Sequence, residues 1–226
     1  MGVLVAGGTG ALGQAVVGEL LDSGYGCTVT WIVERERQEM EQQMGDRVKL
    51  VHADLIDPGG GAAEAVAAVD DLEAVVNLVG GYAEGGLVHE TEPDQFHRMI
   101  ELNLTPAFNL ARAALPRMLE RGEGAFVGVS ARPALRPFAG AAGYITGKAA
   151  VLAFIQVLDA EYRKQGIRCN AILPSVIDTP ANRGTMPNAD HSKWVAPEAI
   201  AKVVRFLVSD DSAPTSGAAV PVYGRA

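Results

Sequence analysis

The chain has 226 residues, of which 48% are hydrophobic and 20% charged, and this composition is typical of a globular protein. The net charge of −8, with no basic stripe, argues against nucleic-acid binding. No apolar run approaches the ~20 residues of a membrane span, so we expect no membrane segment. Cys27 and Cys169 lie far apart in apolar runs, without metal-ligand spacing. We therefore expect a cytoplasmic protein with no metal site.

Short apolar runs alternate with longer amphipathic ones along the whole chain. Strands are expected at Val3–Ala6, Thr28–Val33, Val48–Ala53, Ala74–Val79, Ala125–Val129, Arg168–Leu173 and Ala218–Val222. Helices are expected at Leu12–Leu21, Gln38–Met44, Ala62–Val69, from about Asp94, and at Leu104–Arg121, Tyr144–Lys164 and Pro197–Val208.

This alternation predicts one α/β domain over residues 1–226. The strands are apolar on both faces, as in a parallel sheet that helices cover on each side. We expect a single Rossmann-type, doubly wound parallel sheet. One polar segment at about residues 175–196 breaks the rhythm, and its length is typical of a functional lid over a substrate.

A glycine-rich turn joins the first strand to the first helix. Glycines there allow a sharp turn and a close approach to a pyrophosphate, which the helix N-terminus binds through free N–H groups. This position within a βαβ unit is the context that a dinucleotide site requires. The expected phosphate-binding residues are Gly7, Thr9, Gly10, Ala11, Leu12 and Gly13.

The end of the second strand usually selects between NAD and NADP. Glu34 there is able to hold ribose hydroxyls, which favours NAD, whereas Arg35 or Arg37 is able to hold the 2′-phosphate of NADP. We expect NAD or NADP as the cofactor, with NAD slightly favoured. Asp54, after the third strand, is a candidate for the adenine amino group, or a cap of the following turn.

Tyr144 and Lys148 lie four residues apart, on one face of a predicted helix. A free phenol has a pKa of about 10, and a nearby ammonium lowers it. The pair therefore predicts a Tyr general acid–base supported by Lys.

In this order the motifs resemble the short-chain dehydrogenase/reductase family over essentially the whole chain. They are Gly7–Gly13, Asp54-Leu55, Asn77-Leu78-Val79-Gly80, Asn103, Tyr144 with Lys148, Arg168–Ile172, Pro174–Thr179 and Ser216-Gly217.

The resemblance implies a role for each matching residue. Tyr144 would donate the proton, and Lys148 would hold the nicotinamide ribose. Asn103 would hold a water in a proton relay. Ile177 would meet the nicotinamide amide through its backbone, and Thr179 would lie near the pyrophosphate. The expected cofactor-binding set is completed by Leu55, Asn77, Gly80 and Pro174.

Two positions depart from the family pattern. Ala11 stands where the glycine turn usually has Gly, and Ala131 stands where the family has its substrate-orienting Ser. Ser130, one residue earlier, is a candidate replacement, but adjacent residues of a strand point to opposite faces. Both departures, with Gly80–Ala83 and Leu173–Arg183, also resemble the dihydropteridine reductase branch of the family.

The expected substrate is a small molecule with a carbonyl, quinonoid or imine-like group. The alternatives are a 3-oxoacyl carrier-protein or general ketone reductase, and a non-catalytic NAD(P)-sensing regulator. Relatives commonly pair through the helices that contain Asn103 and Tyr144, so we expect a homodimer or homotetramer. The alanine-rich faces Ala107–Ala114 and Ala149–Ala153 either form that interface or pack on the sheet.

Overall fold

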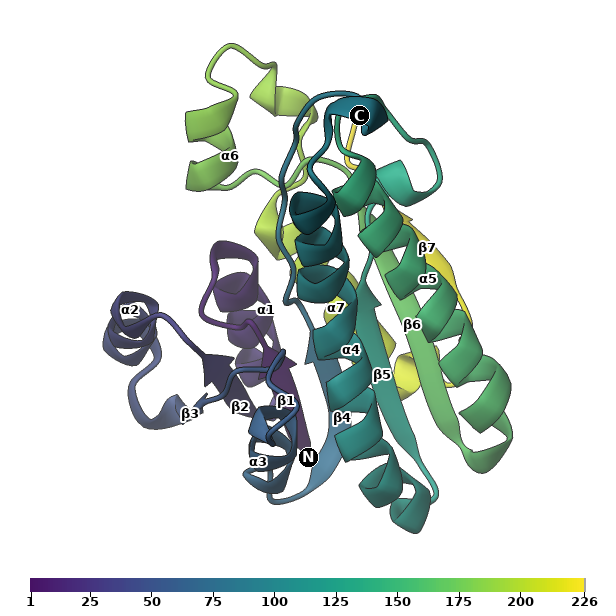
Figure 1. Cartoon of the computed structure of the whole chain (residues 1–226). Helices are drawn as coiled ribbons and strands as arrows, with labels where there is room; N and C mark the ends of the chain where they lie inside the picture. The colour runs from purple at the N-terminus through teal and green to yellow at the C-terminus, as the bar shows by residue number, and fades with distance from the viewer. Residues whose placement is uncertain (226) are drawn as a thin grey trace.

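The computed structural model describes residues 1–225 and contains one seven-stranded sheet (Figure 1). All neighbouring strands pair in parallel, in the order β3-β2-β1-β4-β5-β6-β7. The strands are β1 Gly2–Ala6, β2 Gly26–Trp31, β3 Val48–His52, β4 Leu72–Asn77, β5 Gly124–Val129, β6 Ile167–Pro174 and β7 Ala219–Val222. The order in which successive strands are added reverses between β1 and β4, because β2 and β3 extend the sheet on one side of β1 and β4 to β7 extend it on the other. Sheets of this type bind ligands at that point.

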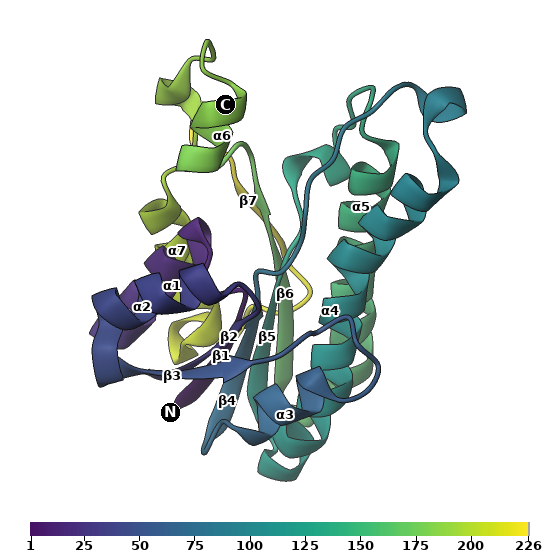
Figure 2. The same cartoon turned by 60° about the vertical axis from the view of Figure 1, so that its left-hand side comes forward.

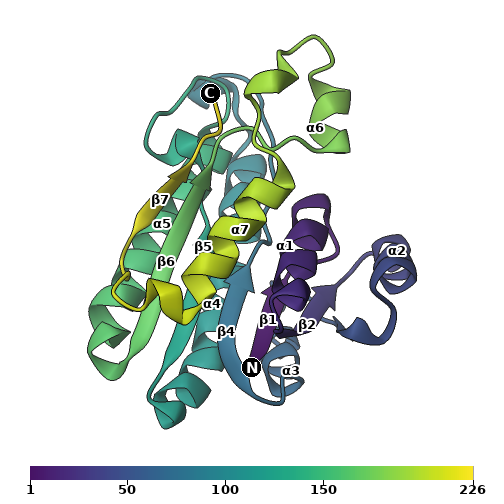
Figure 3. The same cartoon turned by 180° about the vertical axis from the view of Figure 1, so that it is seen from behind.

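Helices cover both faces of the sheet. They are α1 Ala11–Asp22, α2 Glu34–Met44, α3 Gly61–Ala67, α4 Pro93–Arg121, α5 Ala142–Tyr162, α6 Pro180–Thr185 and α7 Pro197–Val208. Seen nearly along the sheet, α1, α2 and α7 lie on one side and α3, α4 and α5 on the other (Figure 2). The view from behind shows α7 beside α1 (Figure 3). This arrangement confirms the predicted doubly wound fold.

The alternation of side chains along the strands explains the two layers. In β1, Val3 and Val5 belong to the core under α1 and α7, whereas Leu4 and Ala6 belong to the core under α3, α4 and α5. All four side chains are fully buried. A strand covered on both faces has to be apolar at consecutive positions, and this is why the sequence shows runs instead of strict alternation.

The structure corrects three expected elements. The two helices predicted around Asp94 and Leu104 are one continuous helix, α4, which contains Pro106 and Pro116. Both halves of α4 bury residues on one face, including Met99 and Leu110, so packing overrides the proline signal. Helix α2 begins at Glu34 instead of Gln38. The expected loop over 175–196 contains the short helix α6.

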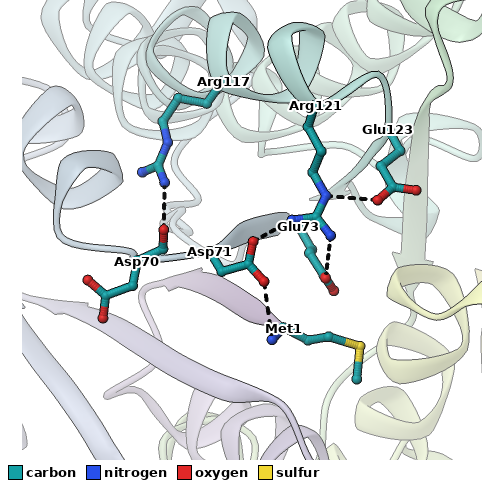
Figure 4. A network of polar contacts seen from close by, with 7 residues as sticks. All are labelled: Met1, Asp70, Asp71, Glu73, Arg117, Arg121 and Glu123. Atoms are coloured by element: carbon teal, nitrogen blue, oxygen red, sulfur yellow. Dashed lines mark hydrogen bonds and ion pairs between the residues drawn. The ribbon is translucent and has the colours of Figure 1, made fainter.

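The amino-terminal edge of the sheet is held by a polar network around the end of α4 (Figure 4). Arg121 forms ion pairs with Asp71, Glu73 and Glu123, and Asp71 also pairs with the amino group of Met1. Exposed ion pairs stabilise little singly, so the effect of this network is mainly to fix α4 against the start of β4. It lies at the edge opposite to the carboxyl ends of the strands.

The alanine-rich face of α4 packs inward. Ala107, Ala111 and Ala114 are at most 2% exposed and belong to the core of this chain. Phe108 and Val157 are about half exposed on α4 and α5, and the Phe108 and Phe154 rings lie 6.1 Å apart. An apolar interface on these two helices would therefore use their aromatic residues and not the α4 alanines.

Two glycines of α1 provide a test of the close packing under the glycine turn. A Cβ on Gly13 would lie 2.4 Å from the backbone of Gly8, whereas a Cβ on Gly18 would meet only the end of the Met44 side chain, at 3.9 Å. We expect Gly13→Ala to lower the free energy of unfolding by about 1–3 kcal/mol. Gly18→Ala should raise it by about 0.5–1 kcal/mol, because alanine favours a helix interior. Urea unfolding of both variants measures this, and equal effects would contradict the packing argument.

Candidate active site

The glycine turn lies at the carboxyl end of β1, in the middle of the sheet. Gly7 has φ = +71°, a conformation that glycine adopts freely, and its N–H donates to the Thr30 hydroxyl on β2. The missing side chain of Gly13 lets α1 begin directly against the turn. Both the sequence and the backbone conformation of this turn therefore suit the close approach of a ligand to the main chain.

Helix α1 begins with backbone donors that the protein itself leaves free. Its N-cap is Gly10, with no side-chain cap, and its first turn carries no acidic residue. The first N–H groups of a helix lack intrahelical partners and carry partial positive charge, so they favour an anion. A pyrophosphate fits this end of α1, at Gly10, Ala11, Leu12 and Gly13, because the first turn of α1 contributes no carboxylate of its own.

The end of β2 holds charged residues that mostly pair with one another. Arg37 binds both carboxylate oxygens of Glu34 and also pairs with Glu41, while Arg35 pairs with Glu39. The hydrogen bond from Arg37 holds the pKa of Glu34 below its ordinary value. Both arginines proposed to bind a 2′-phosphate are therefore already engaged with carboxylates of α2.

The carboxylate that reaches the glycine turn is Glu36. The Thr9 hydroxyl donates to Glu36 Oε2 at 2.9 Å, and Thr9 is only 3% exposed. Glu36 was not among the expected site residues, because the helix after β2 was expected to begin only at Gln38. With α2 beginning at Glu34, Glu36 lies in the first helical turn and points toward the turn after β1.

Residues after β3 and β4 form the next part of this edge. Asp54 is exposed and accepts a hydrogen bond from the N–H of Ile56, so it does cap the following turn, with one carboxylate oxygen left over. Leu55 and Asn77 are buried, and Asn77 accepts from the N–H of Val79. These side chains shape the backbone of the site and leave little of their own surface to a ligand.

Tyr144 and Lys148 both lie on α5, near its N-terminus and one helical turn apart. Lys148 is 7% exposed, and its ammonium donates to the carbonyl of Val129 at 3.0 Å. Among the described residues, the Tyr144 hydroxyl has no hydrogen-bond partner, and no buried side-chain polar atom lacks one. The phenol oxygen of Tyr144 therefore opens to solvent, where a substrate is able to reach it.

Burial shifts the pKa values of the pair in opposite directions. It lowers the pKa of Lys148 to about 8 and raises the pKa of Tyr144 to about 12. The direction for Tyr144 is the reverse of the one expected for a phenol beside an ammonium. In the ligand-free protein, Lys148 is turned toward Val129, and its charge does not offset the burial of Tyr144.

Asn103 ties α4 to the chain after β4. Its side-chain amide donates to the carbonyls of Gly81 and Met99, and its oxygen accepts from the N–H of Gly81 at 3.3 Å. A Cβ on Gly80 would lie 2.6 Å from Asn103 Oδ1 and 2.7 Å from Lys148 Nζ. Asn103, Gly80 and Lys148 thus meet at one point, and the side chain of Asn103 orders the loop there.

Ser130 lies on the face of β5 that α5 covers, but its hydroxyl is engaged with the backbone of that helix. Its hydroxyl is 1% exposed and donates to the backbone carbonyl of Lys148 at 2.7 Å. No bulge re-aims it, because β5 pairs regularly with β6 and the Ser130 N–H continues the ladder to Ile172. Ala131 follows in extended conformation, with no hydroxyl to offer.

The segment after β6 holds the last predicted cofactor contacts. Pro174 ends β6 and is buried, and Thr179 caps α6 by accepting from the N–H of Asn182. The carbonyl of Ile177 already accepts from Asn182 Nδ2 and from the N–H of Thr179. A nicotinamide amide would therefore meet the N–H of Ile177 more readily than its carbonyl. Helix α6 projects beyond the carboxyl ends of the strands (Figure 2).

Among residues 1–225, no cluster of His, Cys, Asp and Glu has the arrangement of a metal site. Within the same residues, no helix combines the length and apolarity that crossing a membrane requires. The arrangement at the carboxyl edge thus comprises an anion-binding helix end, a carboxylate beside it and a Tyr–Lys pair.

Comparisons with known proteins identify the family of this chain. A family model described as short chain dehydrogenase matches residues 2–190. The 2-(R)-hydroxypropyl-CoM dehydrogenase of Xanthobacter autotrophicus is 32% identical over 194 residues, which cover 79% of this chain and 78% of that protein. The acetoacetyl-CoA reductase of Paracoccus denitrificans is 28% identical, with 95% and 93% covered.

A solved structure gives the same fold. The structure of ElxO with NADP bound superimposes with a TM-score of 0.91 and covers 99% of this chain and 97% of that one. At 23% sequence identity this likeness shows the fold alone.

The buried ammonium of Lys148 has a measurable effect on stability. Because its pKa is lowered from 10.5 to about 8, the folded state binds this proton more weakly than the unfolded state does. Below pH 8 this opposes folding by up to about 3 kcal/mol, and the penalty disappears as pH rises from 8 to 10.5. We expect Lys148→Met to be more stable than the parent at pH 7 and to lose that advantage near pH 10.

Urea unfolding at both pH values measures the effect. Lys202→Met, at an exposed position of α7, is the matched control and should show no such pH dependence. A Lys148→Met variant that is no more stable at pH 7 would contradict the burial argument.

Proposed function

The chain belongs to the short-chain dehydrogenase/reductase family and is an NAD(P)-dependent oxidoreductase, and we propose that Tyr144 and Lys148 are its acid–base pair. The proposed substrate is a small molecule with a carbonyl, quinonoid or imine-like group. The observation that carries this proposal is the free phenol of Tyr144 one turn before a lysine that is 7% exposed.

The residues of the chain have separate tasks in this mechanism. NAD(P)H supplies the hydride when it is bound. The Tyr144 hydroxyl delivers a proton to the substrate oxygen or nitrogen as that atom gains negative charge. Lys148 would hold the ribose hydroxyls of a bound cofactor, and its positive charge near the phenol would lower the pKa of Tyr144, which burial raises to about 12.

The lack of a free hydroxyl at positions 130 and 131 limits the class of substrate that the site suits. Ala131 offers none, and Ser130 donates to Lys148. A preorganised donor to a developing oxyanion contributes about 3–4 kcal/mol at the transition state. A quinonoid or imine substrate spreads its charge and needs only one donor, so it suits this site. A 3-oxoacyl or general ketone reductase is the second candidate, which the likeness to acetoacetyl-CoA reductase favours.

A non-catalytic sensor is a weaker alternative. Lys148 opposes folding at neutral pH because its ammonium is buried. A protein that only binds a dinucleotide through the glycine turn has no need of that charge. We propose further that the chain forms a homodimer or homotetramer, with Phe108 and Val157 in the interface, because these apolar side chains are exposed on α4 and α5.

Steady-state oxidation of NADH and NADPH, with a panel of ketone, quinonoid and imine substrates, tests the mechanism. We expect Tyr144→Phe to lower kcat by at least about a hundredfold, because general acid–base groups contribute about 10²–10⁴ in rate. Lys148→Met should lower both kcat and cofactor affinity. Ser130→Ala is the matched control on β5, and it should keep most of the activity. A large loss in Ser130→Ala would favour the ketone reductase with a displaced serine.

Cofactor choice gives a second test, with Glu34 and Glu36 as a matched pair. We propose that Glu36 disfavours a 2′-phosphate, because it lies at the glycine turn while Glu34 is bound by Arg37. Glu36→Gln should tighten binding of NADP⁺ relative to NAD⁺ about tenfold, as the removal of one nearby like charge implies. Glu34→Gln should change this ratio less than threefold. Calorimetric titration with both dinucleotides measures it, and a larger effect of Glu34 would return the role to that residue.

A further inference from the structure

A second tyrosine lies directly against Tyr144. The ring centroids of Tyr82 and Tyr144 are 4.9 Å apart, and their planes meet at 81°, the edge-to-face geometry that aromatic pairs favour. Tyr82 comes from the loop after β4, whereas Tyr144 lies on α5. Two segments more than sixty residues apart therefore meet at the proposed acid–base group.

The position of Tyr82 is fixed by the residues that precede it. Gly80 passes so close to Lys148 and Asn103 that a Cβ there would collide with both. A Cβ on Gly81 would lie 2.3 Å from the Leu102 side chain, and the Asn103 amide binds both backbone groups of Gly81. The chain thus lies tightly on α4 until the residue immediately before Tyr82.

The far end of the Tyr82 side chain is fixed as well. Its hydroxyl donates to Glu84 Oε2 at 2.6 Å. The next residue, Gly85, donates through its N–H to the carbonyl of Gly140 at 2.7 Å, just before α5 begins. Tyr82 is 56% exposed. It is nevertheless restrained by its backbone, by the bond of its hydroxyl to Glu84, and by the bond of Gly85 to the loop of residues 130–141, which faces it.

No hydrogen bond among the described residues holds the Tyr144 phenol. Its hydroxyl has no hydrogen-bond partner among residues 1–225, Ala131 lacks a hydroxyl, and Ser130 is turned toward the backbone of Lys148. The contact with the Tyr82 ring is therefore one restraint on the orientation of the Tyr144 side chain. An acid–base group has to lie within hydrogen-bond reach of the reacting atom, and small displacements are costly in rate.

We propose that Tyr82, anchored by Glu84, is a positioning residue that holds the Tyr144 phenol in the orientation needed for proton transfer. This inference rests on the proposed role of Tyr144. It assigns to the Tyr82 ring the orienting task that a serine at position 131 would otherwise share. The hydroxyl of Tyr82 serves the anchor, so the ring matters more than the phenol oxygen.

Three variants distinguish the effect of the Tyr82 ring from the effect of its hydrogen bond to Glu84. Tyr82→Leu removes the ring, and we expect kcat to fall about tenfold with cofactor affinity and the midpoint of thermal unfolding unchanged. Tyr82→Phe keeps the ring and loses the bond to Glu84, and kcat should fall no more than about threefold. Phe138→Leu is the matched control, since Phe138 lies on the facing loop and is 46% exposed. It should behave as the parent.

A spectroscopic measurement tests the contact independently of turnover. In protein with ¹³C-labelled tyrosine, the Tyr144 ring signal is assigned as the one that disappears in Tyr144→Phe. We expect this signal to shift in Tyr82→Leu, because the ring current of Tyr82 is lost, and to stay in place in Phe138→Leu.

Two results would overturn the inference. One is an unshifted Tyr144 signal in Tyr82→Leu, and the other is a kcat within twofold of the parent in that variant. Failure of the proposed function looks different, because Tyr144→Phe would then keep its activity whatever the Tyr82 variants do.

Discussion

The site depends on the burial of one lysine between two helices and a strand. Lys148 is able to lie under the chain after β4 because Gly80 has no side chain there. Helix α5 approaches α4 closely at the preceding residue, since a Cβ on Gly147 would lie 2.9 Å from the carbonyl of Met99. These small residues remove water from around the ammonium, and its pKa falls to about 8 as a result. A larger residue at position 80 would displace the lysine, and one at position 147 would push α5 away from α4.

The close packing around Lys148 also determines where Asn103 and Tyr82 lie. Asn103 faces Gly147 and fills the corner between α4 and the loop after β4, where it binds Gly81. That loop then carries Tyr82 onto the ring of Tyr144. Tyr144, Lys148, Asn103 and Tyr82 therefore form one packed unit. The glycine turn with Glu36 forms a separate unit at the ends of β1 and β2. A dinucleotide is long enough to connect the two, because both lie at the carboxyl edge of the sheet.

The fold was predictable because the central strands are largely apolar on both faces, as β1 and β5 show, and every crossover is long enough for a helix. Membership of the short-chain dehydrogenase/reductase family was also predictable, from motifs in a fixed order. Details that depend on tertiary packing were not. Two helices were expected, from about Asp94 and from about Leu104, but α4 is continuous because both halves bury the same face. Glu36 was hidden in a charged cluster whose helix begins four residues earlier than predicted. The contact of Tyr82 joins segments far apart in the chain and leaves no local pattern.

Burial of Lys148 disfavours its charged form. Its ammonium donates to the carbonyl of Val129, and an ammonium has three donors. Oxygen atoms brought to Nζ would satisfy the remaining donors and raise the pKa of Lys148 toward its ordinary value. The same positive charge would then offset the burial that holds the pKa of Tyr144 at about 12. If Lys148 has the proposed role, binding free energy would be linked to the acidity of the phenol, because one ammonium would serve both. Proton transfer from Tyr144 would then be tied to the bound state.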